Sequence, residues 1–237
     1  MGRDKAWLPW LGQPMVCHVV ARLSETLDDI VVVAAADQML PALEARIVHD
    51  REPHLGPLAG LREGLEAIEH PHAFVTATDA PFLTSRFIQH LTSHEEPITL
   101  EIGGFVQTLC AVYPAKAGSV ADQLLSQGKR RPLQLIDDMD FRRLRDGEVI
   151  DPDAIRGFNT PDAYLDAVRE IEPDAKARVT LESGETRSAP VASVAEVLRA
   201  VDLDPEQVEV NRDQGPHFAN LLAPVGADET LWVTKRT

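Results

Sequence analysis

Residues 72–83 read HAFVTATDAPFL, and this stretch decides the fold class. It predicts a strand that ends at Asp79, is closed by Pro81 and is followed by a helix from about Thr84. An acidic residue at the carboxyl end of a strand, directly before a turn and a helix, is typical of an α/β sheet whose ligands gather at that edge.

The segments that precede this strand repeat the alternation of strand and helix. Ile30–Val33 is β-branched and too short for a helix, so it predicts a strand buried on both faces. LPALEARIVHD at 40–50 predicts a short helix and a strand ending on Asp50, and GPLAGLREGLEAIEH at 56–70 predicts a helix. We therefore expect βαβ units and a Rossmann-like, doubly wound, mostly parallel α/β sheet.

The pattern changes after residue 173. KARVTLESGETRSAP at 176–190 alternates about a Ser-Gly turn, and SVAEVLRAV predicts a short helix before two further strands. This ββαββ order predicts a small α+β domain over 173–237, behind a first domain over 1–172.

Composition excludes several classes of function. The formal net charge of −15 argues against general nucleic-acid binding, which needs a basic surface. No apolar run approaches the roughly 18 residues of a membrane span, and the N-terminus lacks a signal-like apolar core. Cys17 and Cys110 have no metal-type spacing and fit two buried thiols in a reducing cytosol, so a cytoplasmic location is expected.

Three polar features fall where the strands end. Asp50 and Asp79 each close a strand, and Gly56 opens a helix whose free N–H groups suit an anion. Asp79 suits a hard cation such as Mg²⁺ held against phosphate oxygens, and Lys5 offers a positive charge. Each has a plainer reading: Asp79 as a helix cap, Asp50 and Gly56 as turn residues, and Lys5 as a solvated charge. The basic cluster KRR at 129–131 is a solvated helix end or a contact for an anionic substrate.

Together these segments resemble the molybdenum cofactor guanylyltransferases, the MobA family of the nucleotidyltransferase superfamily. The matching segments, in the family's order over about residues 1–170, are MGRDKAWLPWLGQPM, HDREPHLGPLAGLREGL, TATDAPFL, FVQTLCAVYP and FNTPDAYL. The resemblance implies a transferase that moves GMP from GTP to molybdopterin, with Mg²⁺, and releases pyrophosphate. It leaves room for protein partners among molybdoenzymes or other cofactor-biosynthesis proteins.

The resemblance also assigns residues. It implies that Lys5 contacts nucleotide phosphates, that Asp50 lies near the guanosine, that Gly56 belongs to the nucleotide site and that Asp79 binds the metal. Asn159 matches a family position, and there we expect a helix-capping role. Where some relatives place an Asn after the second strand, this chain has Val and Ala at 33–34.

The family begins with a strand and a glycine-rich loop, and its Met-Gly is Met1-Gly2 in this sequence. We therefore expect that Met1 is an internal methionine, that the working protein extends upstream, and that the chain as printed is impaired in catalysis. The absent strand would normally lie at the centre of the sheet, which would leave hydrogen-bonding groups on both neighbours without a partner.

The C-terminal segment SVAEVLRAVDLDPEQVEVNRD resembles the ThiS/MoaD-like β-grasp sulfur carriers. Those carriers end in Gly-Gly, whereas this chain ends in TKRT, so we expect an interaction module rather than a carrier. Two alternatives to guanylyl transfer stay open at this point. One is a cytidylyl- or sugar-phosphate nucleotidyltransferase, and the other is a catalytically impaired binding protein that presents its C-terminal module.

Overall fold

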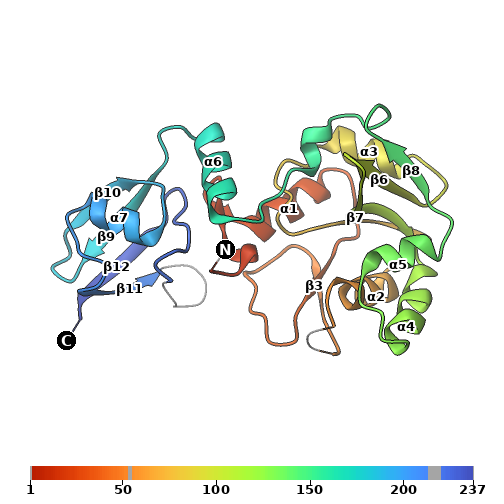
Figure 1. Ribbon diagram of the computed structural model, residues 1–237, viewed down its shortest axis with the longest axis horizontal. Coiled ribbons are helices and arrows are strands. Elements are labelled where there is room, and N and C mark those ends of the chain that lie inside the picture. Colours follow the sequence, from red (N-terminus) through yellow and green to blue (C-terminus); the bar gives the residue numbers. More distant parts are fainter. Residues whose placement is uncertain (1, 53–54, 213–219, 237) are drawn as a thin grey trace. The chain divides into compact units, whose positions relative to one another are not determined.

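The computed structural model describes residues 2–52, 55–212 and 220–236 (Figure 1). Met1, Pro53, His54 and Asp213, which belong to segments quoted for the resemblances, lie outside the described residues. The chain divides into two compact units: Met1–His18 with Gly157–Thr237, called the terminal unit, and Val19–Arg156, called the central unit. The predicted domain boundary near residue 173, between a first domain over 1–172 and a second over 173–237, stays a prediction.

The central unit contains two sheets. A four-stranded sheet has the order β5-β7-β6-β8, in which β7 pairs antiparallel with β5 and β6, and β6 pairs parallel with β8. A separate pair, β3 and β4, is parallel. The strands are β3 (Val31–Ala34), β4 (Arg46–His49), β5 (His72–Thr76), β6 (Ile98–Ile102), β7 (Phe105–Pro114) and β8 (Arg142–Arg145). The α/β class is confirmed, and the pairings are mixed.

Helices cover both faces of the four-stranded sheet. Cys110 and Val112 of β7 pack in one core with α3, whereas Ala111 and Tyr113 pack in a second core with α2, α4 and α5. This alternation is the period of two of a strand buried on both sides. The helical segments are α2 (Pro57–Ala67), α3 (Ser85–Thr92), α4 (Ala117–Ser126), α5 (Pro132–Asp137) and the 3₁₀ turn η2 (Pro152–Ile155).

Helix α2 lies close to β3 because of two glycines. A Cβ on Gly60 would lie 3.9 Å from Val33 Cγ1, and one on Gly64 would lie 3.2 Å from Val33 Cγ2. The spacing of four residues places both glycines on one face of the helix. The sequence GPLAGLREGL therefore fixes how α2 approaches β3, the strand that pairs with β4.

The terminal unit combines both ends of the chain. It begins with η1 (Lys5–Trp7), β1 (Pro9–Trp10), β2 (Gln13–Pro14) and the start of α1 (Met15–Ser24), which continues into the central unit. It resumes with α6 (Pro161–Ile171). Trp10, Phe158 and Tyr164 form an aromatic cluster in which the Trp10 and Phe158 ring centroids are 5.4 Å apart. This cluster joins the N-terminal segment to α6.

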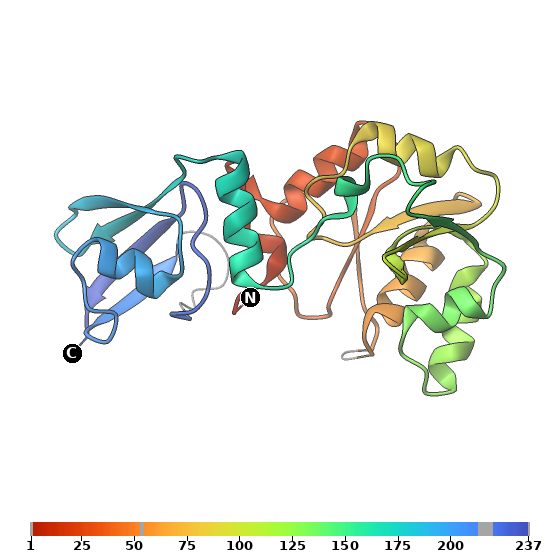
Figure 2. The same ribbon diagram turned by 45° about the horizontal axis from the view of Figure 1, so that its top comes forward.

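The C-terminal sheet has the order β10-β9-β12-β11. Its outer pairs are antiparallel, its central pair β9–β12 is parallel, and in both ribbon views α7 lies across one face (Figures 1 and 2). The elements are β9 (Lys176–Leu181), β10 (Thr186–Pro190), α7 (Val194–Ala200), β11 (Val208–Arg212) and β12 (Thr230–Lys235). The predicted ββαββ order is confirmed, and the likeness to sulfur carriers stays a prediction.

Some local predictions are wrong. The segment 40–45 is not helical, and Val31–Val33 are half-buried rather than buried on both faces. The physical reason for the second is that β3 pairs with β4 alone among the described residues. Strands β6 and β8 and helix α5 were not predicted. Among the described residues, no helix is long and apolar enough to cross a membrane.

Candidate functional site

Asp50 lies directly after β4. Its backbone N–H donates to the Ala34 carbonyl at 2.8 Å, so the ladder between β3 and β4 extends to the carboxylate-bearing residue. One carboxylate oxygen, Oδ1, is buried and has no hydrogen-bond partner among the described residues. Burial, followed by repulsion from Glu63, raises the pKa of Asp50, and Arg62 opposes that rise. An acceptor atom of this kind suits an N–H or O–H donor supplied by a ligand.

Gly56 is the N-cap of α2. Its φ of 78° lies in the left-handed region, which favours glycine, and Pro57 occupies the first helical turn. No side chain caps this helix, so its first N–H groups are not satisfied by a cap. This geometry fits the predicted role of Gly56 as a backbone approach to an anionic ligand, and that role stays a prediction.

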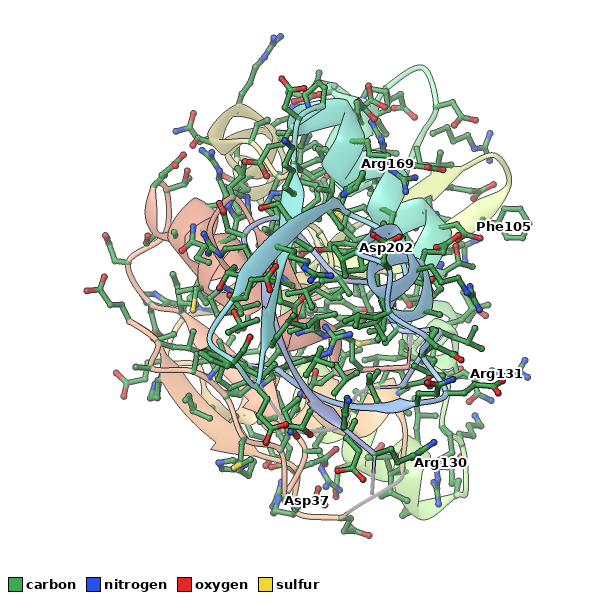
Figure 3. All side chains as sticks on the ribbon, turned by 90° about the vertical axis from the view of Figure 1, so that its left-hand side faces the viewer. Asp37, Phe105, Arg130, Arg131, Arg169 and Asp202 are labelled. Atoms are coloured by element: carbon green, nitrogen blue, oxygen red, sulfur yellow. The ribbon has the colours of Figure 1, made fainter. Side chains whose placement is uncertain are left out.

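The basic cluster 129–131 lies beside Gly56. A Cβ on Gly56 would lie 3.7 Å from the Arg130 carbonyl oxygen. Lys129 approaches Asp138 at 3.6 Å, and Arg130 Nη1 donates to the Leu125 carbonyl at 2.9 Å, whereas Arg131 is exposed and extends outward in Figure 3. The fold therefore places two exposed arginine residues in the loop that adjoins the start of α2, which the local sequence did not show.

Arg62 is a buried charge that sequence reasoning missed. The residue is 3% exposed, and its guanidinium contacts Glu63 at 2.7 Å and Asp122 at 3.2 Å. A charged residue inside the apolar pattern of GPLAGLREGL was the available signal. Because Arg62 also opposes the raised pKa of Asp50, it is part of the electrostatic surroundings of that carboxylate.

Asp79 lies in the turn between β5 and α3. The N-cap of α3 is Thr84, whose hydroxyl accepts from Phe87 N at 3.2 Å. The plainer reading, in which Asp79 caps the following helix, is therefore wrong. Asp79 is half-buried, and Thr76 at the end of β5 has a buried hydroxyl without a hydrogen-bond partner among the described residues. The strand therefore ends at Thr76 and not at Asp79 as predicted, and Asp79 lies in the turn that follows.

Lys5 belongs to the terminal unit. It opens η1, whose N-cap is Asp4: the Asp4 carboxylate accepts from Ala6 N at 2.9 Å. Lys5 Nζ donates to Asn159 Oδ1 at 3.5 Å. The N-cap of α6 is Thr160, so the expected capping role of Asn159 is wrong. The structure instead brings Asn159 beside Lys5, a pairing across 154 positions of sequence.

The predicted site residues are divided between the two units. Lys5 is in the terminal unit, whereas Asp50, Gly56 and Asp79 are in the central unit. A single crevice that contains both Lys5 and Asp79 therefore stays a prediction. In the described part of the chain, no group of three or more His, Cys, Asp or Glu side chains is arranged to hold a metal ion.

Comparison with known proteins identifies a family that this chain matches. A model of the MobA-like NTP transferase domain matches residues 1–141. A relative from Mycobacterium bovis, named probable molybdenum cofactor guanylyltransferase, is 35% identical over 153 residues, which cover 61% of this chain and 76% of the relative. A Pseudomonas entomophila protein named molybdenum cofactor guanylyltransferase is 32% identical over 135 residues, covering 54% of this chain and 71% of the relative.

Solved structures share the fold. Molybdopterin-guanine dinucleotide biosynthesis protein A from Archaeoglobus fulgidus aligns with a TM-score of 0.57 at 20% identity, covering 73% of this chain and 92% of that chain. A 2-C-methyl-D-erythritol 4-phosphate cytidylyltransferase from Thermus thermophilus aligns with a TM-score of 0.54 at 15% identity, covering 69% of this chain and 91% of that chain. At these identities the likeness concerns the fold alone.

Proposed function

The chain belongs to the MobA-like NTP transferase family, and we propose that it transfers GMP from GTP to molybdopterin and releases pyrophosphate. The names of the curated relatives support the choice of guanylyl transfer over cytidylyl or sugar-phosphate transfer. The observation that carries the proposal is Asp79, a half-buried carboxylate in the turn after β5 that does not cap the next helix.

The residues of this chain bind and orient the nucleotide. Lys5, steadied by Asn159, is assigned to the triphosphate, where an ammonium group offsets the charge that builds on the leaving pyrophosphate. The buried Oδ1 atom of Asp50 is assigned to a donor on guanosine. A phosphate oxygen of molybdopterin attacks the α-phosphorus of GTP, and the bond from that phosphorus to the pyrophosphate oxygen breaks. Because no covalent intermediate with the protein is needed, positioning and electrostatics supply most of the rate.

The carboxylate in the turn after β5 fits a magnesium ion. Mg²⁺ takes oxygen ligands and is commonly held by one or two carboxylates with substrate phosphates and water completing its shell. Asp79 supplies one such carboxylate, and oxygen atoms of GTP and water would complete the shell. When bound, Mg²⁺ would neutralise charge on the phosphate oxygens.

The cytoplasm is the proposed location. Cys17 and Cys110 form no disulfide among the described residues, and Cys110 is buried whereas Cys17 is half-buried rather than buried as predicted. GTP and molybdopterin are the proposed small-molecule partners.

Pyrophosphate release from GTP in the presence of molybdopterin and Mg²⁺ tests the function. We expect release with GTP and far less with CTP or ATP, and we expect Asp79→Asn to abolish it while thermal unfolding stays unchanged. Stabilisation of the protein by GTP with Mg²⁺ is measured alongside turnover.

Asp140→Asn is the matched control, since Asp140 is an exposed carboxylate in the same unit. It should leave both turnover and GTP binding unchanged. Full turnover in Asp79→Asn, or neither turnover nor GTP stabilisation in the unmodified protein, would contradict the proposal.

A further inference from the structure

A cluster of buried charges joins the two ends of the chain inside the terminal unit. Glu229 is 2% exposed and Arg212 is 3% exposed, and their side chains meet at 2.6 Å. Arg3 reaches the same carboxylate from the other end of the chain, at 2.7 Å and 2.9 Å to its two oxygens. Arg3 and Glu229 are 226 positions apart in sequence.

The Glu229 carboxylate is fully occupied. Oε1 accepts from Arg3 and Arg212, and Oε2 accepts from Arg3 and from the backbone N–H of Gly226 at 3.0 Å. Four hydrogen bonds match the acceptor capacity of a carboxylate. Arg3 contacts both carboxylate oxygens through one nitrogen, Nη1, and these charge-assisted hydrogen bonds define where its guanidinium group lies.

Arg3 in turn fixes the start of the chain. Its Nη2 donates to the Trp7 carbonyl at 2.9 Å, which closes a bridge over η1. A second attachment follows at Pro9, whose carbonyl accepts from the Tyr164 hydroxyl at 2.5 Å. Lys5 lies between these two attachment points, so its backbone is held from both sides.

Gly226, which precedes β12, packs against both residues of this second attachment. A Cβ on Gly226 would lie 2.3 Å from the Tyr164 hydroxyl oxygen and 2.8 Å from Pro9 Cβ, so the backbone at 226 touches both residues. The family match ends at residue 141, so Gly226 and Glu229 lie outside it. The contact therefore links the segment that contains Lys5 to a part of the chain beyond the matched domain.

We propose that Glu229 is a positioning residue for the nucleotide site: through Arg3 it fixes the backbone that presents Lys5 to the GTP phosphates. The C-terminal sheet then contributes to the nucleotide site, because it holds the segment that contains Lys5 in position. This inference rests on the proposed function, because it assigns Lys5 to GTP.

The charge balance explains why the carboxylate is needed. Arg3 and Arg212 bring two cations to one buried place, and burial and the Arg3 charge both lower the pKa of Arg212 while Glu229 opposes them. Without Glu229 the two guanidinium groups would face each other with no counter-ion among the described residues. Arg3, whose side chain is linked to η1 through the Trp7 carbonyl, would then be displaced together with η1.

Two substitutions separate the positioning role from the folding role. Arg3→Met keeps an unbranched side chain and leaves the Glu229–Arg212 ion pair intact, so the C-terminal sheet retains its own buried pair. Glu229→Gln keeps the size of the side chain and removes its charge. Glu209→Gln is the control, because Glu209 is exposed on β11 of the same sheet.

The first measurement is the affinity for GTP with Mg²⁺, at a temperature at which fluorescence shows each variant to be folded. We expect Arg3→Met and Glu229→Gln to weaken binding about tenfold, as for the loss of one charge-assisted hydrogen bond. Affinity for molybdopterin should stay within about twofold of the unmodified protein, and Arg3→Lys, which keeps one ion pair, should restore part of the GTP affinity.

The second measurement is amide hydrogen exchange. Exchange of the amides of Ala6 and Leu8, which donate to the Asp4 carboxylate and the Lys5 carbonyl, should rise in both variants, with the central unit unchanged. A role confined to folding of the C-terminal sheet would instead raise exchange in β9–β12 and leave GTP affinity of the folded protein unchanged.

The outcomes are distinguishable. If the unmodified protein does not bind GTP, the proposed function fails, whatever exchange shows. If it binds GTP and folded Arg3→Met binds GTP equally well, the positioning role of Glu229 is refuted. Tighter binding in Glu229→Gln would also refute it, since that result would mean that a released Arg3 contacts the nucleotide itself.

Discussion

The Tyr164 hydroxyl is expected to contribute measurably to the stability of the terminal unit. Tyr164 is fully buried and donates to the Pro9 carbonyl at 2.5 Å. In the β1–β2 pairing Pro9 lies opposite Pro14, and proline has no N–H to donate. Removing the hydroxyl in Tyr164→Phe therefore leaves the Pro9 carbonyl without its Tyr164 donor.

The size of the effect follows from this loss. A buried acceptor left without a partner costs about 1–3 kcal/mol, whereas an exchange of hydroxyl for hydrogen at an exposed site costs almost nothing. A loss of about 2 kcal/mol lowers the ratio of folded to unfolded molecules roughly thirtyfold. For a unit of about 100 residues each kcal/mol lowers Tm by about 4–8 °C.

Tryptophan fluorescence is the assay, because it reports on the terminal unit alone. The three tryptophans of the sequence, Trp7, Trp10 and Trp232, all lie in that unit. The ring of Trp10 lies 6.5 Å from that of Tyr164. Denaturant unfolding followed by this signal should show a lower midpoint for Tyr164→Phe with an unchanged slope, which indicates a change in stability rather than in exposed surface.

Tyr113→Phe provides the matched control. Tyr113 is equally buried and donates to the Thr108 carbonyl at 2.8 Å, but it lies in the central unit. It should leave the tryptophan-detected midpoint unchanged. A free energy of unfolding for Tyr164→Phe within about 0.5 kcal/mol of that of the unmodified protein would refute the reasoning, since the Pro9 carbonyl would then find a partner elsewhere.

Three further predictions concern packing, a thiol and pH. Gly226→Ala should lower the free energy of unfolding by about 1–3 kcal/mol in the same assay, because its Cβ would lie 2.3 Å from the Tyr164 oxygen. Gly147→Ala should leave that free energy unchanged, because the space around Gly147 is open. Burial raises the pKa of the Cys110 thiol to about 12, so peptide mapping should find it unlabelled by a thiol reagent at pH 8 until the central unit unfolds, and earlier labelling would contradict the burial. Burial acts to raise the pKa of Glu63, but hydrogen bonds from two neighbouring arginines outweigh it and lower this pKa overall. The stability that Glu63 contributes is therefore present above its pKa in the unfolded chain, about 4.3, and is lost as pH falls through its lower pKa in the folded protein. Circular dichroism should show a flatter acid limb for Glu63→Gln, and parallel losses in both proteins would disprove the assignment.

Local sequence determined most of the elements and their ends. The caps Thr84, Thr160 and Ser193 each begin a helix where the pattern predicted one. Asp50 directly follows β4 as predicted, whereas Asp79 lies in the turn beyond β5 and does not end that strand. The confirmed predictions succeed because hydrophobic period and capping chemistry act between residues a few positions apart.

The missed elements depend on distant partners. Strand β8 reads RRLR and is stabilised by pairing parallel with β6, about 40 positions earlier. The expected helix at 40–45 does not form, and this short segment contains Pro41, which is unfavourable inside a helix. Neither outcome is visible in a window of neighbouring residues.

The arrangement of charges was decided by the tertiary structure. The sequence identified Lys5 as a candidate site residue, but only the folded chain places Asn159 beside it and attaches Arg3 to Glu229. A short-range pattern cannot encode a contact between residues more than 150 positions apart, because such a contact depends on how whole elements pack. The identities of the site residues thus follow from motif and position, whereas what holds them follows from the fold.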